Sequence, residues 1–217
     1  MALKKYFFVG AFILVVLSVL VIPIQRLLVN ESKANAIKSV GGSVPYREFG
    51  QPITVVDFSN KNVTDGALEK LIGLDDLHYL YLTGTQVTDA GLKKLAGLKK
   101  LKALTLDNTL ITDAALKELG HFRYIRELYV TNTKVKDAGV KELIQLKEIR
   151  TLQLGNTDVS DKCLKDLSEL TELQDLNLSN TRVVGCGLKE LARLPELRTL
   201  FCLERKYEIL RLRSWPS

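Results

Sequence analysis

A repeat of 24 residues runs through the middle of the chain and constrains its fold more than any other feature. The best-formed copy, Leu77–Leu98, has the pattern L-x-x-L-x-L-x-x-T-x-V-T-D-A-G-L-x-x-L-x-x-L. Two of its polar positions recur at the same interval: Asp65, Asp89, Asp113, Asp137 and Asp161, and Thr85, Thr109, Thr133, Thr157 and Thr181. A period of this length, held over six copies, predicts a solenoid in which each repeat packs against its neighbours.

Each copy contains two hydrophobic periods. Leu80 and Leu82 are two residues apart, as in a short strand, whereas Leu92, Leu95 and Leu98 are three apart, as in one stripe of a helix. The strand positions are Val56, Leu80, Leu104, Leu128, Leu152, Leu176 and Leu200. The fold class is therefore predicted as an α/β solenoid with a parallel sheet on the concave face and short helices on the convex face.

The polar positions that recur are expected to be structural. One repeat position holds either asparagine or glycine: Asn60, Gly84, Asn108, Asn132, Asn156 and Asn180. Such an exchange predicts a positive φ angle. The following threonine is expected to bond the turn backbone. The Thr-Asp pair before each helix is expected to cap its free amides, and this role is favoured over calcium binding by the aspartates.

The motif Thr88-Asp89-Ala90-Gly91-Leu92 resembles the repeats of bacterial, notably planctomycete-like, leucine-rich repeat proteins. Those proteins commonly combine a membrane span with a segment similar to residues 36–42 before the repeats. The resemblance implies the solenoid fold, but most such relatives have no assigned activity. A more distant likeness links the repeats to F-box leucine-rich proteins, although no F-box precedes them here.

An uncharged run from Tyr6 to Gln25 precedes the repeats. At about 1.5 Å per helical residue, it could cross the roughly 30 Å core of a bilayer. Lys4 and Lys5 before the run outweigh Arg26 after it, so we expect a cytoplasmic N-terminus and an extracytoplasmic repeat domain. A cleaved signal peptide with secretion is the alternative, and a soluble protein is the least favoured one.

Four regions follow from these patterns. Residues 1–26 are predicted as a cytoplasmic tip and transmembrane signal anchor, and 27–54 as a linker and N-terminal cap. Residues 55–202 hold about six full repeats and a seventh strand. The pattern fails in residues 203–217, which we interpret as a degenerate C-terminal cap or tail.

The charge balance argues against nucleic acid as a partner. The net charge of +6 divides into +4 in residues 1–54 and +2 in residues 203–217. Residues 55–202 hold 21 basic and 21 acidic side chains. Because a nucleic-acid site needs a basic face on the folded domain, we expect no such face here.

The residue types that carry chemistry are few. Cys163, Cys186 and Cys202 fall in positions that hold small or apolar residues in other repeats, so they are expected to fill the core. His78 and His121 occupy different repeat positions and have no nucleophile or metal ligand at a recognisable spacing. We therefore expect neither an enzyme nor a bound cofactor or metal.

The outward strand positions vary from repeat to repeat. Tyr79, Tyr81 and Tyr129 form the most anchor-like cluster, because tyrosine brings a large contact area at little entropic cost. Tyrosine also covers a sheet well without any partner, and that interpretation stays open. The candidate partner-binding residues are Tyr79, Tyr81, Tyr129, Asp57, Gln153, Asn177 and Phe201.

The hypothesis for function is a membrane-anchored extracytoplasmic protein that binds a protein or another macromolecule through its concave face. A self-associating envelope scaffold is the first alternative. A cytoplasmic adaptor, as the F-box likeness implies, is the second.

Overall fold

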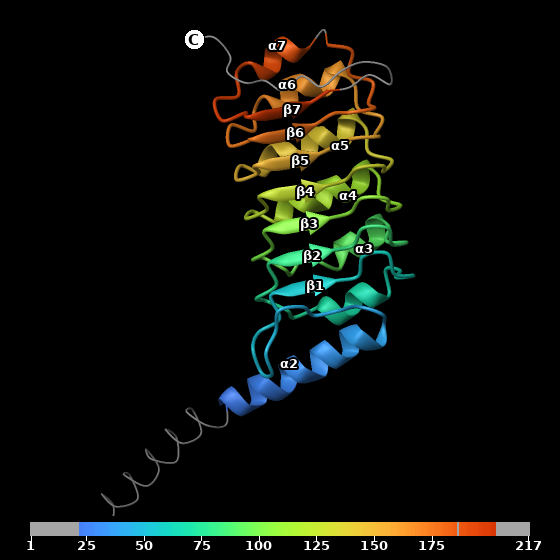
Figure 1. Cartoon of the computed structure of the whole chain (residues 1–217), viewed down its shortest axis with the longest axis vertical. Coiled ribbons are helices and arrows are strands. Elements are labelled where there is room, and N and C mark those ends of the chain that lie inside the picture. Colours follow the sequence, from blue (N-terminus) through green and yellow to red (C-terminus); the bar gives the residue numbers. More distant parts are fainter. Residues whose placement is uncertain (1–21, 186, 203–217) are drawn as a thin grey trace, which may run out of the picture.

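The computed structural model describes residues 22–185 and 187–202 and contains one parallel sheet of seven strands in chain order. The strands stack one above another, and the helices form a single layer on one side of them (Figure 1). The middle residue of every strand is the apolar residue that the period predicts, so the predicted α/β solenoid is confirmed. The strands are β1 (Val55–Asp57), β2 (Tyr79–Tyr81), β3 (Ala103–Thr105), β4 (Glu127–Tyr129), β5 (Thr151–Gln153), β6 (Asp175–Asn177) and β7 (Thr199–Phe201).

The helices are short because each repeat has few residues between its turns. They bury their leucine stripe against the back of the sheet, where Leu80, Leu92 and Leu95 are fully buried in one continuous core. The α-helices are α3 (Asp89–Lys93), α4 (Asp113–Glu118), α5 (Asp137–Glu142), α6 (Leu164–Leu167) and α7 (Leu188–Leu191). Four 3-10 helices accompany them: η2 (Ala67–Leu71), η3 (Leu119–His121), η4 (Leu143–Gln145) and η5 (Asp161–Cys163).

The turn after each of the strands β1–β6 has the predicted left-handed residue. The asparagines at this position have φ angles between 54° and 57°, and Gly84 has a φ of 69°. In the turns after β2–β6, a threonine follows and donates its hydroxyl hydrogen to the carbonyl oxygen three residues earlier. In the second repeat, for example, Thr85 Oγ1 lies 2.7 Å from the oxygen of Leu82. Both expectations for these two positions are confirmed.

The recurring aspartate has a different role from the one predicted. Asp65 does not cap its own helix but reaches the next repeat, where its Oδ1 accepts the backbone N–H of Thr88 at 2.8 Å. Its Oδ2 accepts the Thr88 hydroxyl at 2.6 Å. The hydroxyl of Thr88 in turn accepts the N–H of Ala90, which makes threonine the helix cap. The capping role predicted for aspartate is therefore wrong: the carboxylate connects adjacent repeats, because parallel stacking brings the next Thr N–H within its reach.

The same connection recurs along the solenoid. Asp89 binds Thr112 and Asp137 binds Ser160 through both backbone and hydroxyl, and Asp113 binds the N–H of Lys136. The series stops at Asp161, whose buried Oδ1 has no hydrogen-bond partner among the residues that the structure describes. The regular motif ends at the same point.

A helix and a turn cover the open end of the first repeat. Helix α2 (Ile22–Ser39) runs beneath the stack and packs beside η2 (Figure 1). Ala34 and Ile37 are buried in the core, and Ser43 forms an antiparallel bridge with Asp57. The described part of the helix already includes Ile22, inside the apolar run, so it extends further toward the N-terminus than the predicted linker.

Part of the predicted organisation lies outside the described residues. This applies to most of the apolar run Tyr6–Gln25, to the tail at 203–217 and to Cys186. Across residues 22–185 and 187–202, no helix is both long enough and apolar enough to cross a bilayer.

Candidate binding surfaces

The register of the sheet places the candidate residues in two adjacent rows on its open face, the face opposite the helices. The third residue of each strand forms one row, which holds six of the candidates. Tyr79, the seventh candidate, belongs to the row of first residues, beside Tyr81 on the same strand. The six in one row are Asp57, Tyr81, Tyr129, Gln153, Asn177 and Phe201.

The three tyrosines gather over β2–β4. Tyr79 and Tyr81 lie on β2 and Tyr129 lies on β4, while β3 between them carries the short side chains of Ala103 and Thr105. Strands that are two apart lie roughly 10 Å from each other. The aromatic side chains on β2 and β4 therefore flank a strand with small residues, and all three tyrosines are partly exposed.

The surroundings of two of these tyrosines favour the neutral hydroxyl group. Burial raises the pKa of both Tyr81 and Tyr129, and the nearby carboxylate of Glu127 raises each pKa further. The hydroxyl of Tyr129 donates to Glu127 Oε2 at 3.3 Å. Neutral hydroxyls can donate as well as accept hydrogen bonds, so this area offers apolar rings with polar ends.

Sequence reasoning missed one aromatic residue near this cluster. Tyr46, in the turn that follows α2, is 99% exposed and has a φ of 56°. It lies close enough to Tyr81 to contribute to the raised pKa of that hydroxyl. No repeat position marks Tyr46, so the period could not have identified it.

The other candidates differ in their surroundings. Asp57 and Asn177 each accept the backbone N–H two residues later, at 2.7 Å and 2.9 Å, so both side chains hold their own turns. Phe201 is 36% exposed at the last strand. Gln153 is partly exposed between Tyr129 and Asn177 in the row. The tyrosines thus form the densest part of the candidate set.

The thiol of Cys163 is buried, as predicted for a core-filling residue. Burial, followed by the carboxylates of Asp137 and Asp166, raises its pKa to about 12. The group is therefore a neutral thiol at physiological pH and a poor nucleophile.

A second surface was missed altogether, at the edge of the sheet where the strands begin. The residue before each of the strands β2–β7 donates its N–H to the carbonyl of the equivalent residue in the preceding repeat, at 2.8 Å each time. This ladder brings three successive helix-to-strand segments together: 99–102, 123–126 and 147–150. They contribute seven basic side chains and a single acidic one, Glu148. We call these seven residues the basic edge: Lys99, Lys100, Lys102, Arg123, Arg126, Lys147 and Arg150.

The expectation that the repeat domain lacks a basic face is therefore wrong at this edge. The equal totals in residues 55–202 are correct, but they average over surfaces that the fold separates. The residues directly before the strands, read down the repeats, would have revealed the edge. They are Thr54, His78, Lys102, Arg126, Arg150, Gln174 and Arg198.

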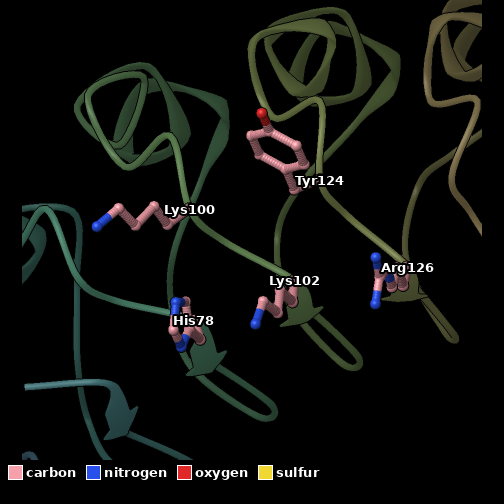
Figure 2. Close-up of a pocket in the computed structure, with 5 residues that line it drawn as sticks. All are labelled: His78, Lys100, Lys102, Tyr124 and Arg126. Carbon is pink, nitrogen blue, oxygen red and sulfur yellow. The ribbon is translucent and has the colours of Figure 1, made fainter.

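A surface cavity of about 290 Å³ lies at one end of the basic edge. Figure 2 shows that His78, Lys102 and Arg126 line it from the starts of β2, β3 and β4, with Lys100 and Tyr124 on the preceding segments. Neither this cavity nor any other part of the described chain has a group of three or more His, Cys, Asp or Glu side chains arranged to hold a metal ion.

Comparison with known proteins identifies the repeat. A family model described as a leucine-rich repeat matches residues 76–96, which include the best-formed motif. An internalin from Listeria monocytogenes is similar over 64% of this chain, with 22% identity and a TM-score of 0.56. A leucine-rich repeat protein from Leptospira interrogans is similar over 61%, with 25% identity and a TM-score of 0.50.

These similarities establish a leucine-rich repeat fold. The aligned region spans 38% of the internalin and 33% of the Leptospira protein, so both are considerably longer than their shared part. No curated protein sequence matches the chain.

Proposed function

We propose that the chain is a binding protein that holds a protein partner on the open face of its sheet, with Tyr79, Tyr81 and Tyr129 as anchors. The observation that carries this proposal is the aromatic cluster on β2–β4, which flanks the small side chains of β3. Nothing in the repeat requires tyrosine at these positions, because alanine, threonine and glutamine occupy them in other repeats.

The chemistry of the cluster suits a protein surface. Partly exposed rings offer apolar area that a partner can cover, and neutral hydroxyl groups can pair with its backbone. The Tyr129–Glu127 hydrogen bond holds one ring in place before binding, which lowers the entropy lost in the complex. The short side chains of Ala103 and Thr105 leave room above β3 for a side chain of the partner.

The same proposal includes a membrane anchor in the apolar run Tyr6–Gln25 and an extracytoplasmic repeat domain. The test removes residues 1–21 and retains Ile22–Ser39, the described helix that covers the first repeat. We expect the full chain to sediment with membranes and the shortened chain to remain in the supernatant. Sedimentation of both would contradict the anchor.

The binding test is a pull-down from native membranes with the full chain in a neutral detergent. The Tyr79/Tyr81/Tyr129→Ala variant is compared with a control that changes three partly or fully exposed residues of the helix side, Lys117, Lys141 and Lys165, to alanine. Circular dichroism establishes that both variants fold. We expect the control to retain the partner and the tyrosine variant to lose it.

Retention of the same partner by the folded tyrosine variant would contradict the proposal. If the unmodified chain recovers only further copies of itself, the result would favour the self-associating scaffold. No residue of the described surface is assigned a catalytic role.

A further inference from the structure

The cavity at the sheet edge is separate from the open face and has a different chemical character. Its lining contains the cations of Lys100, Lys102 and Arg126, one imidazole and one phenol ring, and no carboxylate (Figure 2). The exposed ring of Tyr124 and the aliphatic parts of the lysines form its apolar walls. A cavity of this size and composition accommodates a small anionic group together with part of the molecule that carries it.

Two of the three cations are paired from outside the cavity. Lys100 Nζ lies 2.7 Å from Asp76 Oδ1, and Arg126 Nη2 lies 3.1 Å from Glu148 Oε2. Lys102 forms no ion pair with any residue in the described part of the chain. The Arg126–Glu148 contact uses Nε and Nη2, both bonded to one carboxylate oxygen, so Nη1 remains available.

The backbone fixes the positions from which three of these side chains extend. His78, Lys102 and Arg126 are the three successive members of the N–H to carbonyl ladder that precedes β2, β3 and β4. Their Cα atoms are therefore fixed at the strand spacing, about 5 Å from one repeat to the next. The cations of Lys102 and Arg126 therefore start from neighbouring strands before a ligand arrives, which lowers the cost of binding.

The pKa of the His78 imidazole depends on the charges that surround the cavity. Burial lowers its pKa, and the cations of Lys102 and Lys100 lower it further, whereas Asp76 opposes them. The imidazole also lies edge-to-face against Tyr79, with the ring centroids 6.3 Å apart. The charged and titratable groups around this part of the edge are Asp76, Tyr79, Lys100, Lys102, Tyr124, Arg126, Glu148 and, on α2, Arg26, which also affects Asp76.

We propose that this cavity is a binding site for a phosphoryl oxyanion. Lys102 supplies the unpaired charge, Lys100 and the free amino group of Arg126 complete the donor set, and Tyr124 packs against the group that bears the phosphate. This site is independent of the partner-binding function of the open face. Two kinds of ligand carry such a phosphoryl group: a soluble phosphorylated compound and the head group of a phospholipid.

Binding is coupled to the proton on His78. An anion in the cavity offsets the lysine charges that disfavour imidazolium, so it raises the pKa of His78. By linkage, protonation of His78 strengthens anion binding, and affinity increases as the pH falls.

The test follows the His78 resonances by NMR in the full chain, kept in a neutral detergent. The chain has two histidines, so a His121→Gln background leaves His78 as the only imidazole. Inorganic phosphate is titrated against chloride at matched ionic strength. We expect saturable shifts and a higher pKa of His78 with phosphate but not with chloride.

Matched variants locate the site. Lys102→Gln removes the unpaired cation, whereas Lys117→Gln removes an equal charge from an exposed position on α4. We expect Lys102→Gln to weaken phosphate binding by about tenfold or more, the usual value of one charge-assisted hydrogen bond, and Lys117→Gln to leave it unchanged. Arg126→Gln provides a second test if Lys102→Gln lowers the melting temperature.

A second arm distinguishes the sources. The chain is placed in phosphatidylcholine nanodiscs with or without phosphatidic acid. A response to phosphatidic acid but not to inorganic phosphate, lost in Lys102→Gln, would support the lipid source. No response to either probe, or equal losses in Lys102→Gln and Lys117→Gln, would overturn the proposal.

Discussion

The two kinds of segment that connect strands and helices differ sharply in this solenoid. Strand-to-helix segments repeat the same polar residues in nearly every copy, whereas helix-to-strand segments change from Asp75-Asp76 to Lys99-Lys100 and then to Arg123-Tyr124. The constant residues form hydrogen bonds with backbone groups of the solenoid. The variable ones lie at the surface, where they form the basic edge and its cavity.

The constant segments are constant because the backbone needs those side chains. The turn requires a left-handed residue, the threonine satisfies a carbonyl of its own repeat, and the aspartate satisfies an N–H of the next repeat. In the variable segments, the backbone satisfies itself through the N–H to carbonyl ladder and does not need these side chains as hydrogen-bond partners. Repetition in this chain therefore marks structural need, and variation marks surface available for binding.

The largest loss of stability is expected for Gly84→Val, in a constant segment. The φ of 69° is strained for a β-branched residue, and a Cβ at Gly84 would lie 2.6 Å from Asn60 Oδ1. We expect a loss of about 3 kcal/mol in the free energy of unfolding, measured by urea denaturation. Gln86→Val introduces the same side chain at an exposed position and should change stability little. Equal losses would refute the left-handed assignment.

A smaller loss is expected for Asp89→Ala, which removes a connection between two repeats. The N–H of Thr112 loses its acceptor, so we expect a loss of about 2 kcal/mol in the free energy of unfolding. Asp89→Asn should lose less, since its amide oxygen can still accept that N–H. Asp75→Ala, an exposed aspartate of a variable segment, serves as the control. A larger effect at Asp75 would reverse the comparison.

The buried threonine is expected to contribute less than the aspartate. Thr109→Val keeps the shape of the side chain but removes the hydroxyl that donates to the Leu106 carbonyl at 2.6 Å. We expect a loss of about 1 kcal/mol, measured by thermal unfolding. Thr171→Val, at an exposed position of a variable segment, should have almost no effect, and a drop as large as that of Thr109→Val would count against the assignment.

The smallest effect on the free energy of unfolding is expected from protonation of His78, which lies in a variable segment. Its pKa in the folded state lies below the ordinary value of 6.5, so the unfolded chain binds the proton more readily. The contribution of His78 to the free energy of unfolding is therefore fully present above pH 6.5 and decreases as the pH falls below it. His78→Gln should remove this contribution and leave stability at pH 8 unchanged, as measured by denaturation across the pH range. A contribution of the opposite sign would contradict the positive potential at the cavity.

The sequence predicted much of this architecture because one period determines both the strands and the core. It identified the left-handed asparagines and the threonine bond, since these depend on neighbours within one repeat. It assigned the wrong partner to Asp89 because the donor, Thr112, lies one repeat away, and its distance from the carboxylate depends on the stacking. It missed the basic edge because a total charge over residues 55–202 does not say which of the charged side chains the fold brings to one edge of the sheet.

The candidate site was predicted in part. Tyr79, Tyr81 and Tyr129 could be grouped because they share rows of the predicted sheet. Tyr46 could not be added, since it lies in an irregular turn whose position depends on how α2 packs against the first repeat.

The central claim is that the variable open face of the sheet holds the partner. Site-specific photo-crosslinking in the native host tests this claim most directly. A photoreactive phenylalanine analogue replaces Tyr129 on the open face or Lys141 on the helix side. The proposal predicts a cross-linked partner from position 129 and none from position 141. Cross-links from position 141 alone, or equal yields of the same product from both positions, would contradict it.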